Sequence, residues 1–233
     1  MTTERSTTLI TGANRGIGLE LVRQYAEAGW RVFACCRRPS EADVLNELTT
    51  GGLVSVHQLD VTDARERETM KATVGSTPID VLINNAGIYG QRDADFGNSD
   101  EDRWLETLRV NVIAPLKVME TLADAVAASK RKLIANLSSR MGSIGDNDSG
   151  GSYVYRSSKA ALNQIVKSAA NDLHERGITV VALHPGWVRT DMGGGQALID
   201  VNESVTGLRK VLDRATLKDS GKFFNYDGAI VSW

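Results

Sequence analysis

The sequence predicts an α/β protein in which a doubly wound parallel β-sheet carries helices on both faces. Two observations support this fold class: short apolar segments alternate with longer amphipathic ones from end to end, and no change in composition marks a second domain. Of the 233 residues, 42% are hydrophobic and 24% charged, which is enough to bury one large core. We therefore expect residues 1–233 to form a single domain of the Rossmann type.

Six short segments rich in β-branched or aliphatic residues are predicted to be strands, because most are apolar almost throughout, as strands covered on both faces should be. They are Thr7–Thr11, Arg31–Cys35, Leu53–Leu59, Val81–Asn84, Leu133–Leu137 and Thr179–His184. Helical patterns occupy Ile17–Ala28, Asp63–Val74, Trp104–Leu122 and Tyr153–Glu175. Gly29 suits the left-handed position after the first of these helices, Gly177 ends the last, and Asp63 is a suitable N-cap.

Two polar, glycine-containing segments follow predicted strands: Tyr89–Asp100 and Arg140–Ser152. Ligands of open parallel sheets bind beyond the carboxyl ends of the strands, where such loops lie. We expect both segments to border a binding site, with ordinary solvent loops as the alternative.

Charge and cysteine content narrow the class of partner. The net charge is −2, from 27 basic and 29 acidic residues, and predicts no long-range attraction to nucleic acid or anionic lipid. Cys35 and Cys36 are neighbours, which offers no disulfide framework and suits a reducing compartment. The sequence shows no secretory signal, no apolar run long enough for a membrane span and no spacing of metal ligands. We expect a cytoplasmic protein that acts on a small molecule without a metal.

The segment Thr11–Gly18 lies between the first predicted strand and the first helix. Gly12 would permit a tight turn, Gly16 a close approach of the backbone, and Gly18 packing of the helix on the sheet. The start of the helix would then present free N–H groups to a pyrophosphate. This context predicts a dinucleotide-binding loop rather than a plain turn.

The residues after the second predicted strand indicate which dinucleotide is bound. An NAD site usually has an acid there that binds the adenosine ribose, but this chain has Arg37 and Arg38, with no acid before Glu41. Arg37 could pair with a 2′-phosphate, and Arg15 could add a second positive charge. Solvated surface arginines are the alternative. The pattern favours NADP(H) over NAD(H).

Tyr155 and Lys159 are four residues apart and lie on one face of a predicted helix. A nearby ammonium group lowers the pKa of a tyrosine, which makes the phenol a usable proton donor. Ser138 and Ser139 follow a strand, so either hydroxyl could face the same cleft. Asn111 has apolar neighbours, so its amide should lie near the core and need partners.

With these motifs the sequence resembles the short-chain dehydrogenase/reductase family, of the compact type. Thr11–Gly18 is similar to the family's TGxxxGxG loop, Asn84–Gly87 to its NNAG segment, and Pro185–Thr190 to its PGxVxT segment. The motifs occur in the family's order over about residues 7 to 192. Within the family, the YRxSKAALN stretch and the ending FFNYDG…W resemble sniffer-like and C-factor-like carbonyl reductases.

The resemblance implies roles for individual residues. The family's catalytic tetrad is matched by Asn111, Ser139, Tyr155 and Lys159. Ser139 would bind the substrate carbonyl, and Tyr155 would donate a proton. Lys159 would bind the nicotinamide ribose and lower the pKa of Tyr155, and Asn111 would hold a water. The implied cofactor contacts are Gly12, Asn14, Arg15, Gly16, Ile17, Gly18, Arg37, Asp60, Val61, Asn85, Ala86, Gly87, Tyr155, Lys159, Pro185, Gly186, Val188 and Thr190. Tyr89, Met141, Trp187 and Met192 could wall a substrate pocket, although Trp187 and Met192 could instead pack their own loop.

Two departures from the family pattern concern the substrate. The gap from Ser139 to Tyr155 is a few residues longer than usual, and the region after Thr190 is short, so we expect a long loop over the pocket and an abbreviated lid around residues 187–202. The leading hypothesis is NADPH-dependent reduction of a small ketone, aldehyde or quinone. Alternatives are a reductase of carrier-bound 3-oxoacyl groups and a non-catalytic NADP(H)-binding regulator in signalling. Analogy suggests a homodimer or homotetramer that pairs through the helices holding Asn111 and Tyr155.

Overall fold

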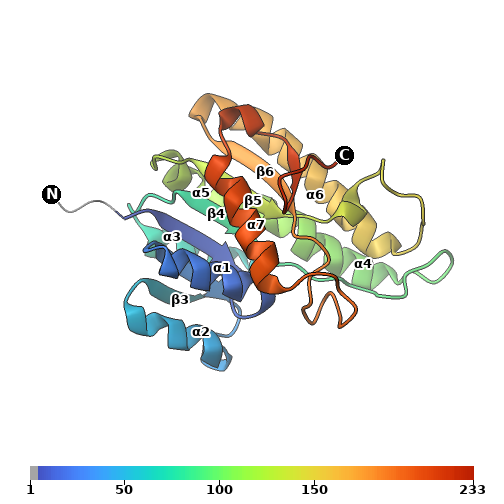
Figure 1. Ribbon diagram of the computed structural model, residues 1–233, viewed down its shortest axis with the longest axis horizontal. Coiled ribbons are helices and arrows are strands. Elements are labelled where there is room, and N and C mark those ends of the chain that lie inside the picture. The colour runs from blue at the N-terminus through green and yellow to red at the C-terminus, as the bar shows by residue number, and fades with distance from the viewer. Residues whose placement is uncertain (1–4) are drawn as a thin grey trace.

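Seven parallel strands form one continuous sheet in a computed structural model that describes residues 5–233 (Figure 1). The strand order is β3-β2-β1-β4-β5-β6-β7. The strands are β1 (Thr7–Thr11), β2 (Arg31–Cys36), β3 (Val54–Gln58), β4 (Val81–Asn84), β5 (Leu133–Leu137), β6 (Thr179–His184) and β7 (Phe223–Asn225). All six predicted strands are confirmed, with small changes at the ends of β2 and β3. The predicted single-domain, doubly wound architecture is confirmed as well.

Helices cover both faces of the sheet. The helices are α1 (Gly16–Glu27), α2 (Asp43–Glu47), α3 (Ala64–Val74), α4 (Glu101–Leu108), α5 (Ala114–Ala127), α6 (Tyr153–Asp172) and α7 (Val201–Arg214). One buried apolar cluster joins the sheet to α1, α2 and α7, and a second joins it to α3, α5 and α6. Cys35 belongs to the second cluster and Cys36 to the first, so adjacent residues of β2 point to opposite faces, and both thiols are free.

The predicted helix ends are confirmed where the sequence supplied a capping residue. Asp63 Oδ1 accepts hydrogen bonds from the N–H groups of Arg65 and Glu66 at 2.7 and 3.0 Å. Gly29 and Gly177 have φ angles of 80° and 70°, the left-handed region that glycine enters at little cost. Helix α6 ends earlier than expected, and a 3-10 turn follows it at His174–Arg176.

The helical run predicted over Trp104–Leu122 is helical throughout, but it is not one regular α-helix. A π-helical turn, Arg109–Ile113, separates α4 from α5. Pro115 is the second residue of α5 and has no N–H to donate to the carbonyl of the preceding turn, so regular α-helical bonding is interrupted there. Asn111 lies in the middle of this π-helical turn.

Strand β7 and helix α7 lie outside the predicted set of elements. Strand β7 has only three residues and is too short to show a sequence pattern. The chain then turns back along it: Val231 N–H donates to the Phe223 carbonyl at 2.8 Å, and Ile230 pairs with Phe224 in an antiparallel bridge. The outer edge of β7 is therefore covered by the chain itself.

The order of strands changes direction between β1 and β4, which in doubly wound sheets is where ligands bind. The segments that follow β4, β5 and β6 reach the same end of the molecule, at the right of Figure 1. Within residues 5–233, no helix combines the length and the apolar character that a membrane crossing needs.

Candidate active site

The glycine-rich loop adopts the shape expected of a phosphate cradle. Gly12 and Gly16 have φ angles of 65° and 53°, which other residues rarely adopt. A Cβ atom on Gly12 would lie 2.9 Å from Ala86 Cα, and one on Gly18 would lie 2.1 Å from the Gly12 carbonyl oxygen. Gly18 thus packs against the Gly12 turn and the Asn85 side chain, whereas the sequence predicted that it would pack the helix on the sheet.

Hydrogen bonds fasten this loop to the segment after β4. The Asn85 side-chain amide donates to the carbonyls of Thr11 and Gly12, each at 2.9 Å. The Thr11 hydroxyl accepts from the N–H groups of Asn85 and Ala86, each at 3.1 Å. Two motifs that are more than 70 residues apart in the sequence therefore form one unit on either side of the switch point.

The start of α1 is suited to a pyrophosphate. Arg15 occupies the N-cap position, and within the described residues no side chain accepts from the first N–H groups of the helix. These donors and the helix dipole favour an anion. Asn14 and Arg15 are exposed and Ile17 is half-buried beside them, so the residues present fit the phosphates of a dinucleotide.

The basic residues around the loop differ in how they are engaged. Arg15 pairs with Asp191 at 2.5 Å. The guanidinium group that was expected to face a 2′-phosphate therefore forms an ion pair with the loop after β6. Arg38 pairs with Glu41 at 3.2 Å. Arg37 is exposed at the end of β2 and has no ion pair among the described residues. Of Arg15, Arg37 and Arg38, Arg37 is therefore the one whose guanidinium is available to bind a phosphate.

Asp60 and Val61, two of the predicted cofactor contacts, follow β3, and the family resemblance implies that Asp60 contacts the adenine. Asp60 Oδ1 accepts from both the N–H and the hydroxyl of Thr62, at 2.9 and 2.7 Å, which fixes its carboxylate in a turn. Val61 is buried. The adenine contact itself stays a prediction.

Asn111 is fully buried and all its side-chain groups are engaged. Its Oδ1 accepts from Ile88 N–H at 2.9 Å, and its Nδ2 donates to the Ile88 carbonyl and to the Ser158 hydroxyl at 2.8 and 3.0 Å. A Cβ atom on Gly87 would lie 3.2 Å from Asn111 Oδ1 and 3.6 Å from Lys159 Nζ. The π-helical turn thus brings this amide beside Lys159, and the expectation of a buried, partnered amide is confirmed.

Tyr155 and Lys159 are both buried on α6, one turn apart. Lys159 Nζ donates to the Leu137 carbonyl at 2.8 Å and lies 5.8 Å from the centre of the Tyr155 ring. Ser139 faces the Tyr155 phenol, and its hydroxyl lowers the pKa of that phenol. The structure therefore brings the four residues of the predicted tetrad together in one site.

The two serines after β5 have different surroundings. Ser138 is buried and its hydroxyl donates to Asn163 Oδ1 at 2.6 Å. Ser139 lies at the start of the 3-10 turn Arg140–Gly142, next to Tyr155. Of the two hydroxyls left open by the sequence, that of Ser139 faces the site.

The pKa values differ from the expected direction at Tyr155. Burial raises the pKa of Tyr155 to about 12, more than the hydrogen bond from Ser139 lowers it. Burial also lowers the pKa of Lys159 to about 8. Our expectation that Lys159 would bring the Tyr155 pKa below its usual value is not met in the protein by itself, because removal of water from the phenol outweighs the effects of its neighbours.

The predicted pocket residues do not share one environment. The rings of Tyr89 and Tyr155 are stacked, with centroids 4.4 Å apart. Met141 is half-buried after Ser139. Trp187 is half-exposed and donates its indole N–H to the Gly193 carbonyl at 2.8 Å, which supports the loop-packing alternative for this residue. The Met192 side chain is partly exposed.

Arg92 is a residue of this region that the sequence analysis missed. Its guanidinium lies 5.2 Å from the centre of the Tyr89 ring and donates to the carbonyls of Asp191 and Met192, each at 3.1 Å. It therefore joins the loop after β4 to the loop after β6. A lone arginine in a polar loop carries no sequence signal for such a contact.

Within the loop after β6, Ile199 packs closely against the Pro185–Gly186 segment. Gly186 has a φ angle of 85°, and a Cβ atom there would lie 2.5 Å from Ile199 Cδ1. Val188 is buried and pairs with Ile199 in a parallel bridge. A Cβ atom on Gly16 would lie 3.3 Å from Thr190 Cγ2, so Thr190 contacts the glycine loop.

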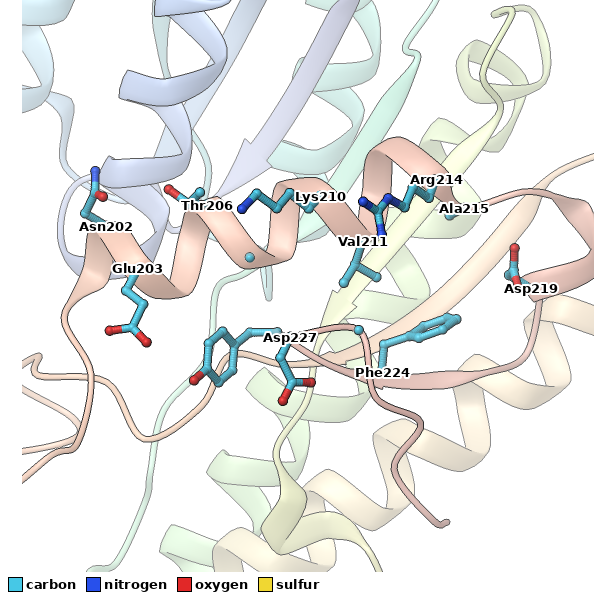
Figure 2. A pocket seen from close by; sticks show the side chains of 13 residues that line it. Asn202, Glu203, Thr206, Lys210, Val211, Arg214, Ala215, Asp219, Phe224 and Asp227 are labelled. Atoms are coloured by element: carbon cyan, nitrogen blue, oxygen red, sulfur yellow. The ribbon is translucent and has the colours of Figure 1, made fainter.

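A hollow of about 490 Å³ lies elsewhere, between α7 and the turn after β7 (Figure 2). Lys210 and Arg214 project from α7 on one side, and Phe224 and Asp227 lie across from them. Its lining includes no predicted catalytic or cofactor residue, so its size does not mark the chemical site. Among residues 5–233 no cluster of metal-binding side chains occurs.

The match to known proteins agrees with this geometry. Residues 6–197 match the family model described as short chain dehydrogenase. The chain belongs to the short-chain dehydrogenase family. The C-signal protein of Myxococcus xanthus is 43% identical over 156 residues, which span 67% of this chain and 93% of that protein.

Two solved structures of carbonyl reductases are similar over nearly the whole chain. The carbonyl reductase Sniffer of D. melanogaster is 33% identical with a TM-score of 0.93, and the NADPH-bound carbonyl reductase from chicken fatty liver is 36% identical with a TM-score of 0.92. Each comparison covers 99% of this chain and 100% of the other. The resemblance to sniffer-like and C-factor-like proteins is therefore confirmed.

Proposed function

We propose that the protein is an NADPH-dependent reductase that converts a ketone, aldehyde or quinone into an alcohol. The observation that carries this proposal is the buried arrangement of Tyr155, Ser139, Lys159 and Asn111 at the carboxyl edge of the sheet. The NADP-bound carbonyl reductases among its structural neighbours support the same cofactor and reaction class.

The residues around the expected cofactor have distinct roles. The N–H groups at the start of α1 and the Gly12–Gly18 turn would hold the pyrophosphate, Arg37 the 2′-phosphate, and Asp60 the adenine. The segment from Pro185 to Thr190 would hold the nicotinamide amide. NADPH, when bound, supplies the hydride for the reduction.

The tetrad provides the proton and stabilises the charge. Ser139 donates to the substrate carbonyl, and Tyr155 gives its proton to the oxygen as negative charge develops there. Because the Tyr155 pKa is about 12, the phenol is protonated at neutral pH and is ready to donate. Lys159 would hold the nicotinamide ribose, and Asn111 holds the Ile88 backbone through two hydrogen bonds.

The Tyr155→Phe variant tests this proposal. We expect loss of turnover, because the phenol donates the proton, while NADPH affinity measured by nicotinamide fluorescence stays nearly unchanged. Tyr153→Phe is a matched control on the same helix, and it should retain activity. If Tyr155→Phe keeps more than about a tenth of kcat, a barrier change of only ~1.4 kcal/mol, Tyr155 is not the proton donor.

Two other functions are weighed against this one. A carrier-protein substrate would favour a basic entrance, but the segment Tyr89–Asp100 has three aspartates against one arginine, a net charge of −2. A non-catalytic signalling role, which the name of the C-signal relative suggests, would not require an intact tetrad. Repeated NADPH oxidation in the presence of a panel of simple carbonyl compounds separates an enzyme from a sensor.

A homodimer or homotetramer is part of the proposal. Leu105 on α4 and Ile113 in the π-helical turn are 58% and 52% exposed, and they lie on the helices expected to pair. Sedimentation velocity would show an oligomer for the wild type and a shift toward monomer for Leu105→Glu. A monomer at all concentrations would contradict this part.

A further inference from the structure

Tyr89 lies against the proton donor in a defined geometry. The rings of Tyr89 and Tyr155 are nearly parallel, at an angle of 11°, with centroids 4.4 Å apart. Stacked aromatic pairs prefer offset or edge arrangements within this range of separation. Tyr89 therefore covers one face of the Tyr155 phenol and leaves its hydroxyl directed at Ser139.

The Tyr89 ring is itself fixed by its surroundings. Its hydroxyl lies 3.3 Å from the hydroxyl of Ser152, the N-cap residue of α6. The Arg92 guanidinium lies over the ring, 5.2 Å from its centre. The next residue, Gly90, is packed so closely that a Cβ atom would lie 2.2 Å from the Thr107 hydroxyl oxygen. The Tyr89 ring is therefore fixed by contacts with Ser152, Arg92 and Tyr155, and the close packing of Gly90 fixes the backbone beside it.

We propose that Tyr89 is a positioning residue, whose ring packs on one face of the Tyr155 phenol and fixes the side chain about its Cα–Cβ bond, so that the hydroxyl stays beside Ser139. This inference rests on the proposed function, because it assumes that Tyr155 is the proton donor. It assigns Tyr89 a role through Tyr155, which differs from the wall of a substrate pocket that we expected from the sequence.

The burial of Tyr155 supports this role. Three groups from different elements face the phenol: Tyr89 from the loop after β4, Ser139 from the end of β5, and Lys159 from α6. Burial and Tyr89 both raise the Tyr155 pKa, while Ser139 lowers it. Removal of the Tyr89 ring would admit water to one face of the phenol, so the Tyr155 pKa should fall toward its ordinary value near 10.

The test compares Tyr89→Ala, which removes the ring, with Tyr89→Phe, which keeps the ring and loses the hydroxyl. We expect Tyr89→Ala to lower kcat about tenfold because the proton donor is no longer aligned. Its KM and NADPH affinity should change little, and the alkaline fall in kcat should move to lower pH. Tyr89→Phe should restore kcat to within about twofold of the wild type.

Phe96→Ala is the matched control, since Phe96 is an exposed ring on the same loop that packs toward Tyr153 and not toward Tyr155. Its kcat should equal that of the wild type. The inference is overturned if Tyr89→Ala keeps wild-type kcat, if it changes KM alone, or if Phe96→Ala loses as much. Activity of Tyr155→Phe separates the two proposals: its loss together with an unaffected Tyr89→Ala rejects only the role of Tyr89. Thermal unfolding of each variant checks that the fold is kept.

Discussion

Lys159 is a buried charged residue of the proposed active site, and its burial lowers the stability of the fold. The side chain is nearly inaccessible, and its ammonium group donates a hydrogen bond to the Leu137 carbonyl at 2.8 Å. Burial lowers its pKa from 10.5 to about 8, which means that the folded protein binds the proton less readily than the unfolded chain. Between pH 8 and 10.5 the unfolded state holds more protons, so this group makes stability rise with pH.

Lys159→Met should therefore stabilise the fold at pH 7. The pKa shift corresponds to about 3 kcal/mol at ~1.4 kcal/mol per unit, and loss of the hydrogen bond to Leu137 offsets about 1 kcal/mol. We expect the free energy of unfolding, measured in urea, to rise by about 2 kcal/mol at pH 7 and by less at pH 10. A less stable variant at pH 7 would contradict the pKa assigned to Lys159.

Arg37 is the residue on which cofactor preference should depend. Arg37→Asp places a negative charge where a 2′-phosphate would lie, so NADPH should bind at least about tenfold more weakly while NADH is unaffected or improved. Nicotinamide fluorescence titrations give both dissociation constants. The adjacent Arg38→Asp makes the same charge change at a residue already paired with Glu41, and it should have a smaller effect. Equal losses in both variants would point to overall charge instead of a specific contact.

At the scale of elements, α7 packs closely on the turn after β7 because Gly207 has no side chain. A Cβ atom on Gly207 would lie 2.5 Å from the Tyr226 carbonyl oxygen and 2.9 Å from its Cδ2. A Cβ atom on Gly186 would lie 3.1 Å from the same ring. Tyr226 thus connects α7 to the segment expected to hold the nicotinamide.

Gly207→Ala tests this packing. In an isolated helix the change would stabilise by about 1 kcal/mol, because glycine is a poor helix former. Here the added methyl group meets backbone, so we expect the free energy of unfolding to fall by about 2 kcal/mol instead. Gly51→Ala, at a position with nothing within 4 Å of the new Cβ, is the control and should change stability little. A stabilised Gly207→Ala would show that α7 can move away from Tyr226 at little cost.

For the whole molecule, the cofactor site joins elements from both halves of the sheet, so occupancy should stabilise the entire fold. NADPH at about a hundred times its dissociation constant should add about 2.7 kcal/mol, and thus raise Tm by about 5–10 °C. Differential scanning fluorimetry measures the shift, and NADH at the same concentration should give a smaller one. No shift with either nucleotide would contradict dinucleotide binding.

The sequence by itself determined the order and type of most elements, because strands buried on both faces and capped helices are local patterns that the chain must satisfy wherever it folds. It likewise predicted the glycine loop, and it gave the hypotheses that Arg37 binds the 2′-phosphate and that Asn111, Ser139, Tyr155 and Lys159 act together. It could not predict β7, whose three residues become a strand only by pairing with β6 and with the chain near Ile230. It also could not show the π-helical turn that aims Asn111 inward.

Only the tertiary structure decided how these residues are engaged. Ser139 faces Tyr155 while Ser138 is bonded to Asn163, although the two are neighbours in sequence. Arg15 is paired with Asp191, and Tyr89 stacks on Tyr155, through contacts between segments distant in the chain. The physical reason is that burial, and with it the pKa of Tyr155 and Lys159, is a property of the packed site and has no counterpart in the spacing of the two residues.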